Sequence, residues 1–307
     1  MLLGKDRMIE AWKNMKTSLV IIIAGLLVGA GVSAAEPVRV LILTGQNNHN
    51  WKVSTPEFKA TLEAAGRFTV EVNETPWNLK PADLDRYDVL VSNWNTYGKK
   101  EVAVDEPAAA AKLKAIPSKP ADPKAKPPPT PVSVWGKEMR AAFDKFITNG
   151  KGFVVIHAGG DIYKDWPEFQ RLIGATWGKG TYHPKPQNFT VKNLAPDHPI
   201  MRGIADFEIM DEAWQRMVVN NPEMKILAKG TVSKENKGTG EPEPYVIVVE
   251  QGKGRCFNLV LGHTAEAHHN PNFAALLCHG VEWAATGQVT LPALVVHTEV
   301  PLSKSSN

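Results

Sequence analysis

A strand-like apolar run that ends abruptly in polar residues constrains this chain more than any other feature. Gly152–Ile156 is apolar and rich in β-branched residues, and it is followed directly by His157-Ala158-Gly159-Gly160-Asp161. Apolar runs of this length are typical of strands buried on both faces, as in parallel sheets. Ligands in open α/β sheets bind at the carboxyl ends of such strands. The run therefore predicts an α/β fold with a candidate site at its end.

Two further apolar runs also lead to a histidine. Val38–Leu43 is followed by a polar loop that contains His49, and Cys256–Leu261 is followed by Gly262 and His263. Because parallel strands present their carboxyl ends at one edge of a sheet, we expect the three histidines to share one polar pocket. The alternative is that each histidine merely caps its own strand.

Strands and helices alternate along most of the chain. The patterns predict strands over Val38–Leu43, Phe68–Val72, Tyr87–Ser92, Gly152–Ile156, Phe189–Lys192, Phe207–Met210, Lys225–Ala228, Tyr245–Glu250 and Cys256–Leu261. They predict helices over Thr55–Ala65, Trp135–Ile147, about Trp166–Ile173 and Asn272–Ala285. This order is typical of a doubly wound, mostly parallel sheet, here with antiparallel strands added late in the chain.

The chain divides into a leader, one domain and a tail. Within residues 1–35, Lys13 and Lys16 precede an apolar stretch of 14 residues from Leu19 to Val32, and Ser33-Ala34-Ala35 follows it, which is the layout of a secretory signal peptide. We expect export to the periplasm or the medium, with an uncleaved N-terminal anchor as the alternative. Residues 36–287 form the α/β domain, and residues 288–307 a tail. Within the domain, residues 99–132 contain eight prolines with many lysines and alanines, which predicts an exposed insertion or flexible loop.

The charge balance argues against two classes of partner. Without residues 1–34 the chain has 31 basic and 30 acidic side chains, a net charge near +1. Proteins that bind nucleic acid or an anionic membrane usually carry an excess of basic residues. This chain has no such excess, so we expect it to bind neither nucleic acid nor, once the leader is cleaved, a membrane. Cys256 and Cys278 are the only cysteines, and both fall in predicted core elements, which favours buried free thiols. The oligomeric state is left open.

The polar strand ends allow two kinds of chemistry. His49, His157 and His263 are the first candidates to bind a divalent metal such as zinc, and Asp161, His183, Asp211 and Glu212 follow. The same imidazoles and carboxylates can instead perform general acid–base catalysis. No compact ligand motif decides between metal binding and acid–base work.

Nucleophilic catalysis is disfavoured, whereas sugar binding is favoured. The position after His157, where α/β enzymes place a nucleophile on a sharp turn, is Ala158. Aromatic side chains beside asparagines and histidines make good platforms for sugar rings. On this basis the residues expected to contact a small-molecule sugar are His49, Asn50, Trp51, Trp94, Trp166, His183 and Thr264. For Trp166 and Trp214, packing in the core is the favoured interpretation.

Several motifs together resemble the trehalose-utilisation (ThuA-like) family. They are His157-Ala158-Gly159-Gly160-Asp161, Asp165-Trp166-Pro167-Glu168-Phe169, Asp197-His198-Pro199-Ile200, Asp211-Glu212, and Gly254-Arg255 leading to His263-Thr264. The resemblance implies the class I glutamine amidotransferase-like superfamily, a flavodoxin-like sheet, and a role with trehalose or oxidised (keto) disaccharides. It also implies that the chain is not a glutamine amidotransferase, because the cysteine of those enzymes is missing. Ala158 and Gly160 depart from the serine and threonine that members often carry.

These observations lead to one expectation and one rival. The chain is expected to be an exported protein that hydrolyses, cleaves by a lyase reaction or isomerises a disaccharide or keto-sugar derivative. His157, His263, Asp161 and Glu212 are the candidate catalytic residues, with His49, His157 and His263 the candidate ligands of a possible zinc-like metal. The rival is a carbohydrate-binding module that performs no chemistry.

Overall fold

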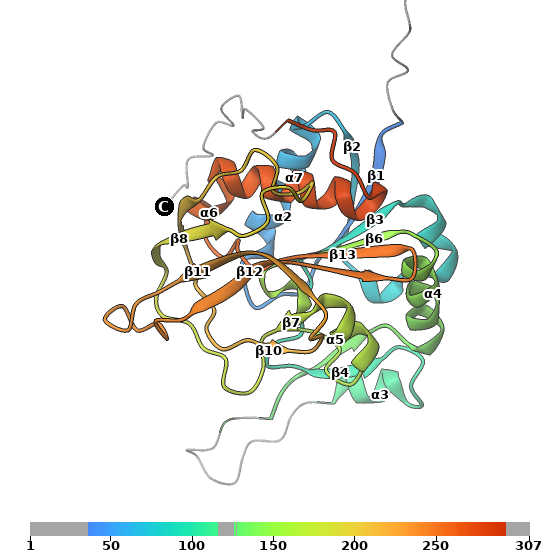
Figure 1. Ribbon diagram of the computed structural model, residues 1–307. Coiled ribbons are helices and arrows are strands. Elements are labelled where there is room, and N and C mark those ends of the chain that lie inside the picture. Colours follow the sequence, from blue (N-terminus) through green and yellow to red (C-terminus); the bar gives the residue numbers. More distant parts are fainter. Residues whose placement is uncertain (1–35, 116–125, 127, 293–307) are drawn as a thin grey trace, which may run out of the picture. The chain divides into compact units, whose positions relative to one another are not determined.

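Five parallel strands form one side of the main sheet in the computed structural model, which describes residues 36–115, 126 and 128–292 (Figure 1). They are β1 (Val38–Leu43), β2 (Phe68–Asn73), β3 (Val89–Ser92), β6 (Gly152–Ile156) and β13 (Gly254–Leu259). Their spatial order is β2-β1-β3-β6-β13, and each neighbouring pair is parallel. This is the flavodoxin-like order, so the predicted fold class is confirmed.

Four more strands extend the sheet beyond β13 in antiparallel fashion. They are β12 (Pro242–Gln251), β11 (Lys225–Thr231), β8 (Gln187–Asn193) and β9 (Phe207–Asp211), in that spatial order. Each is antiparallel to its neighbour, which makes β9 run in the same direction as β13. The carboxyl end of β9 therefore points to the same edge of the sheet as the ends of β1, β6 and β13.

Helices cover both faces of the sheet (Figure 1). On one face, α2 (Trp51–Ala64) and α7 (Pro271–Thr286) pack with the inward-facing residues of the parallel strands into one apolar core. On the other face, α4 (Lys137–Thr148) and α5 (Pro167–Ile173) form a second core. Helix α4 buries Met139, Phe143, Phe146 and Ile147, the helical spacing that places four side chains on one stripe. Two covered faces explain why the central strands are apolar throughout.

The predicted loop over residues 99–132 has regular structure at both of its ends. Strands β4 (Lys100–Ala103) and β5 (Pro131–Val134) pair in parallel, and α3 (Ala109–Lys114) lies between them in sequence. Val102 is buried, so the expectation that this composition adds nothing to a packed core is wrong for β4. Local composition suggested an irregular loop, but pairing with a distant strand overrides it. Residues 116–125 and 127 lie outside the described part.

The remaining elements are short, and most serve as connections. They are η1 (Pro76–Asn78), η2 (Pro81–Arg86), η3 (His157–Gly160), β7 (Ala175–Thr176), β10 (Val218–Val219) and α6 (Ala265–His268). Strands β7 and β10 pair with each other in a separate two-stranded ladder. Cys256 and Cys278 are free and buried, as predicted, and burial raises the pKa of both thiols.

Both predicted terminal segments extend beyond the described residues. The proposed signal peptide, residues 1–35, lies wholly outside them, and the predicted tail is described only from residue 288 to residue 292. Within the described part of the chain, no helix is both long and apolar enough to span a membrane.

Candidate functional site

Four side chains from four strand ends meet at the carboxyl edge of the sheet. His49 follows β1, His157 follows β6, Glu212 follows β9 and His263 follows β13. One potential ligand atom from each residue lies within 4.8 Å of those of the other three. The three histidines expected to share a pocket therefore do share one, and a carboxylate joins them.

The backbone at the end of β6 is strained so that His157 enters this cluster. His157 is buried and has a φ of 47°, in the left-handed region that residues other than glycine rarely adopt. Gly159 makes the turn possible, because a Cβ there would lie 2.1 Å from the carbonyl oxygen of Ser92. The strained position of the turn is thus His157 itself, not Ala158. Backbone strain of this kind is concentrated at functional sites.

Hydrogen bonds fix which nitrogen each imidazole offers to the cluster. His157 Nδ1 lies 2.8 Å from the carbonyl oxygen of Val260, which can only accept, so Nδ1 donates and Nε2 is the nitrogen that faces the cluster. His49 Nδ1 faces the side-chain oxygen of Asn47 at 3.1 Å in the same way. His157 Nε2 in turn lies 3.2 Å from His263 Nδ1, and both nitrogens lie 3.3 Å from Glu212 Oε2. The ring nitrogens of the three histidines and the Glu212 oxygen thus converge on one point.

Glu212 is the anionic centre of the cluster. Trp214 Nε1 donates to Glu212 Oε2 at 2.9 Å, and His183 Nδ1 lies 2.8 Å from Oε1. Burial disfavours its charge, but hydrogen bonds from His157 and His263 outweigh burial and hold the pKa of Glu212 below its ordinary value. The Glu212 carboxylate is therefore ionised at neutral pH.

The neighbouring histidines respond to this charge in opposite directions. The hydrogen bond to Glu212 raises the pKa of His263. Burial, followed by repulsion from His157 and His263, lowers the pKa of His49 to about 3. His49 is consequently neutral at any physiological pH, which is the form that binds metals.

Asp211 holds the loop that carries His263. Its buried carboxylate accepts hydrogen bonds from the backbone N–H groups of Gly262 at 2.6 Å, His263 at 2.9 Å and Thr264 at 3.3 Å. Burial raises the pKa of Asp211 above its ordinary value. The paired acids Asp211 and Glu212 thus have different tasks, since one positions the loop and the other faces the histidines.

A second polar pair supports the same loop from α2 and α6. His268 Nδ1 lies 2.5 Å from Glu57 Oε2, and its Nε2 lies 2.9 Å from the carbonyl oxygen of Gly262. The ring is buried between Phe58 and Phe273. Neither residue was predicted as part of the site, because nothing in the sequence connects Glu57 with a histidine 211 positions away.

Cavities open on both sides of the cluster. One of about 230 Å³ lies toward α2, and its lining includes His49, Asn50, His157 and His263. The inner cavity, of about 90 Å³, is lined by Asn48, His49, Tyr97, Ala158, Asp161, Trp177, His183, Glu212 and Trp214. Asp161 and His183 therefore border the site, as predicted. Asp161 contacts Lys164 Nζ at 2.7 Å, and burial raises its pKa.

Four of the predicted sugar-contacting residues have other surroundings. Trp94 is 1% exposed and Trp166 is 5% exposed; both pack in the aromatic core, among Trp135, Tyr163 and Phe169. Trp51 is the first residue of α2 and does not line the cavities described. The hydroxyl of Thr264 caps α6, since it accepts from Ala267 N and donates to the Met210 carbonyl. Sequence shows that an aromatic residue follows a strand but not which way its ring turns.

Trp177 and Trp214 do reach the site, where they line the inner cavity together with Tyr97. Trp214 packs against the ring of His157 at 4.7 Å between centroids, and Trp177 packs against Trp214 at 5.2 Å. The available sequence signal for Trp214 at the site was its position two residues after Glu212. The sequence pattern nevertheless favours packing in the core for this residue.

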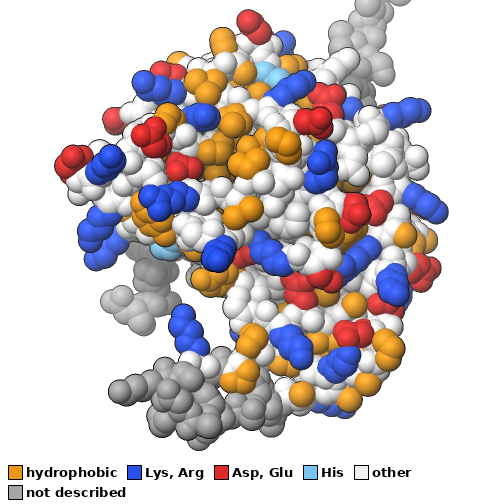
Figure 2. Space-filling model, turned by 60° about the horizontal axis from the view of Figure 1, so that its bottom comes forward, with side chains coloured by type: hydrophobic (Ala, Val, Ile, Leu, Met, Phe, Trp, Pro, Cys, Tyr) orange, Lys and Arg blue, Asp and Glu red, His pale blue; other side chains and the backbone are white. Residues whose placement is uncertain are grey.

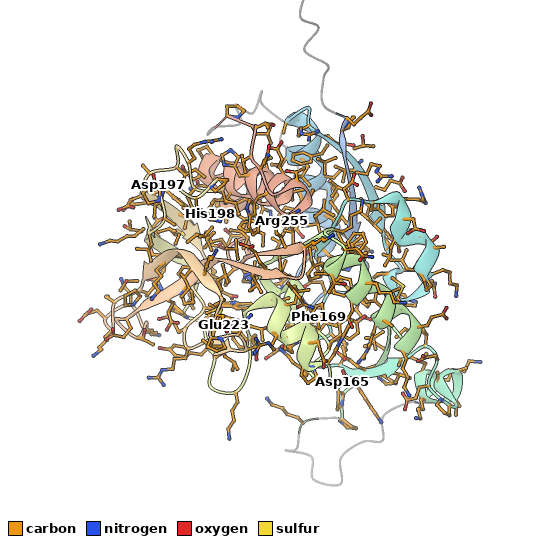
Figure 3. The ribbon with its side chains drawn as sticks, turned by 45° about the vertical axis from the view of Figure 1, so that its right-hand side comes forward. Asp165, Phe169, Asp197, His198, Glu223 and Arg255 are labelled. Carbon is orange, nitrogen blue, oxygen red and sulfur yellow. The ribbon has the colours of Figure 1, made fainter. Side chains whose placement is uncertain are left out.

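Two of the sequence motifs serve the fold instead of the site. His198 packs against Trp283 of α7, and Arg255 Nε donates to the carbonyl oxygens of Trp283 and Ala284 at the end of that helix. Figure 3 shows Asp197 and His198 close to α7, whereas Asp165 and Phe169 lie at α5 across the sheet. The motifs that contain His198 and Arg255 thus fix α7 on the sheet.

Comparisons with known proteins agree with this architecture. The model of the family ThuA, described as trehalose utilisation, matches residues 127–284. A ThuA-like protein from Parabacteroides merdae is 26% identical, with a TM-score of 0.65 over 84% of this chain and 93% of that one. A ThuA-like protein from Bacteroides uniformis is 19% identical, with a TM-score of 0.55 over 83% and 95%.

A third solved structure shares the fold alone. It is a protein from Salmonella typhimurium, named a cytoplasmic protein, that is 13% identical with a TM-score of 0.51 over 80% of this chain and 99% of that one. No curated protein matches. The family model covers more than half of the chain, in the part that contains His157, Glu212 and His263. This chain belongs to the ThuA, or trehalose utilisation, family.

Proposed function

We propose that this chain is a carbohydrate-active enzyme that binds a divalent transition metal through His49, His157, Glu212 and His263. The observation that carries the proposal is the convergence of three imidazole nitrogens and one carboxylate oxygen within 4.8 Å. Zinc, manganese and iron accept this mixture of nitrogen and oxygen ligands. Without a cation or a shared proton, the converging lone pairs would repel one another.

The surroundings of the four residues support metal binding. Metal-binding histidines usually donate their second ring nitrogen to a carbonyl or carboxylate oxygen, which fixes the ring. His157 does so to Val260, and His49 does so to Asn47. Trp214 holds the carboxylate of Glu212 in the same manner. Three of the four candidate ligands are thus oriented by such hydrogen bonds.

The walls of the inner cavity support a sugar as substrate. Trp177 and Trp214 offer apolar ring faces, while Asn48, Asp161 and His183 offer hydrogen-bonding groups. A bound metal would polarise a carbonyl or hydroxyl oxygen of the sugar. The imidazole of His183, which is partly exposed and lies beside Glu212, and the carboxyl group of Asp161 both border this cavity, within reach of a bound sugar for general acid–base work. Hydrolysis, lyase cleavage and isomerisation of a disaccharide or keto-sugar derivative all need such proton transfer.

The decisive experiment measures metal content and turnover together. We expect the full chain, purified with a tag free of histidine, to contain about one equivalent of zinc, manganese or iron by mass spectrometry. The double variant His157→Ala, His263→Ala should lose the metal and also the turnover of keto-disaccharides. His269→Ala is the matched control, because this histidine is exposed and lies outside the cluster.

Other outcomes would change the proposal. A folded protein without metal that still turns over sugars would assign the histidines to acid–base catalysis. A metal-free protein that binds sugars without turnover would support the rival carbohydrate-binding module.

We further propose that the chain is exported. The support is the sequence of residues 1–35, with lysines, an apolar stretch and small residues in signal-peptide order. Cell fractionation followed by N-terminal sequencing should recover a mature protein that begins near residue 36. Recovery of the uncleaved chain from the cytosol would contradict export, and recovery of it from the membrane would favour the anchor.

A further inference from the structure

A larger cavity adjoins the inner one on the side away from His263. This outer cavity has a volume of about 520 Å³ and is lined by Thr96, Tyr97, Gly98, Lys99, Glu101, Asp161, Lys164, Asp165, Trp177 and Gly178. It shares Tyr97, Asp161 and Trp177 with the inner cavity. Pockets that bind small molecules usually measure about 300–1,000 Å³, so the inner cavity of about 90 Å³ is too small to hold a ligand alone.

Aromatic side chains connect the two cavities without a break. Trp214 contacts His157, Trp177 contacts Trp214, and Tyr97 meets Trp177 edge-on with centroids 6.1 Å apart. Tyr97 is 49% exposed and lines both cavities, so its ring is open to a ligand. The rings of Trp214, Trp177 and Tyr97 therefore lead from the histidine cluster into the outer cavity. Together they offer apolar surface for more than one sugar ring.

The charges around the outer cavity largely neutralise one another. Asp161 pairs with Lys164 at 2.7 Å, and Asp165 faces Arg140 at 3.3 Å. On the face seen in Figure 2, acidic and basic side chains are likewise interspersed. A site with internally paired charges favours an uncharged ligand rich in hydroxyl groups over a uronate or an amino sugar.

One segment builds the outer wall and is tied to the site by the half-buried carboxylate of Glu101. Glu101 Oε1 accepts from the hydroxyl of Thr96 and from the backbone N–H of Tyr163 at 2.8 Å. Thr96 N also donates to the carbonyl oxygen of Asp161 at 3.1 Å. This wall, residues 96–101, precedes the part of the chain that the ThuA model matches, residues 127–284.

We propose that the outer cavity is a second sugar subsite, built by Tyr97, Trp177 and Asp161, which selects uncharged substrates of at least two rings. The ring nearer the cluster is the one that reacts, and this part rests on the proposed function. The more distant ring lies against Tyr97. Residues 96–101 thus determine which sugars the enzyme accepts.

Binding of sugars without turnover tests this subsite. Quenching of tryptophan fluorescence should show that wild-type protein binds the neutral disaccharides trehalose and cellobiose at least about tenfold more tightly than glucose, which corresponds to about 1.4 kcal/mol. Tyr97→Ala should abolish that advantage and leave metal content unchanged. Tyr97→Phe should retain it, because the ring remains. Tyr182→Ala is the matched control, since Tyr182 lies outside the outer cavity.

The outcomes separate this subsite from the proposed enzyme. Equal affinity for one and two rings, or a disaccharide advantage that survives Tyr97→Ala, would overturn the subsite. Tighter binding of a uronate-containing disaccharide would overturn the uncharged class. If the protein contains no metal and performs no turnover, yet shows the advantage dependent on Tyr97, the enzyme proposal fails and the subsite stands. Absence of any sugar binding overturns the subsite.

Discussion

The indole of Trp214 performs two tasks at the cluster. Its Nε1 donates to Glu212 Oε2, and its ring packs on His157. Trp214→Phe keeps an aromatic ring beside His157 but removes the hydrogen bond to the carboxylate. Loss of such an outer hydrogen bond typically weakens metal binding about 10–100-fold. We expect this loss in zinc or manganese titrations followed by calorimetry, with the fold unchanged by circular dichroism.

Trp51→Phe provides the comparison for this change. Trp51 is an aromatic residue outside the cavities, so its substitution should leave metal affinity at the wild-type value. Equal affinities for the Trp214→Phe variant and the wild type would mean that Glu212 needs no support from the indole, or that it does not bind the metal.

Sequence reasoning located the polar residues of the site better than the aromatic ones. His157 and His263 follow buried strands directly, and the direction of a parallel strand fixes where its end lies. Trp94 also follows a strand, yet its ring turns into the core. Which way a ring turns depends on neighbours such as Trp135 and Tyr163, which come from distant parts of the chain. Local pattern has no access to that packing.

At the scale of elements, Asp88 connects three parallel strands at the edge opposite the site. Its carboxylate pairs with Arg39 of β1 at 2.8 Å and with Lys151, next to β6, at 2.7 Å, while Asp88 itself precedes β3. Burial disfavours its charge, but the bonds to Arg39 and Lys151 outweigh burial and hold the pKa of Asp88 below its ordinary value. A depressed carboxyl pKa contributes stability above the unfolded pKa near 3.9, and this stability is lost at lower pH.

Asp88→Asn should therefore destabilise the fold in a pH-dependent manner. Near pH 7 we expect its free energy of unfolding in urea to fall by about 1 kcal/mol, because the ion pairs are partly exposed. The gap from the wild type should narrow as the pH falls below about 4, because the Asp88 carboxylate of the unfolded wild-type chain then takes up a proton, whereas that of the folded chain does so only at lower pH. The exposed Asp85 supplies the control variant, Asp85→Asn. A gap that stays constant at all pH values would show that the charge of Asp88 is not what stabilises these strands.

The elements themselves followed from the sequence, but their pairing was only partly predictable. Val38–Leu43 was predicted to the residue, because a run of apolar residues between polar loops defines a buried strand. The pairing of β4 with β5 was missed, since their ladder joins residues about thirty positions apart across a stretch rich in proline. Helix α2 begins at Trp51, four residues before the predicted start at Thr55. Pro56 therefore lies inside the helix and not in its first turn.

At the scale of the whole molecule, a metal at the cluster would connect both halves of the sheet. Its ligands follow β1 and β6 in the parallel part, β13 at the junction and β9 at the far antiparallel edge. An ion that binds only the folded chain stabilises it by about 2.7 kcal/mol when its free concentration is 100 times Kd. For a chain of this size, that corresponds to a rise in Tm of about 5–10 °C.

We therefore expect a chelator to lower the Tm of the metal-loaded protein by about 5–10 °C. His157→Ala, with one ligand missing, should show little or no response to the chelator. Because Glu212 raises the pKa of His263, a proton competes with the metal at that nitrogen, and the stabilisation should fade as the pH falls through this raised pKa. Differential scanning calorimetry across a pH series measures both effects. An unchanged Tm after the metal is removed would mean that the ion does not bridge the four strand ends, whatever its role in catalysis.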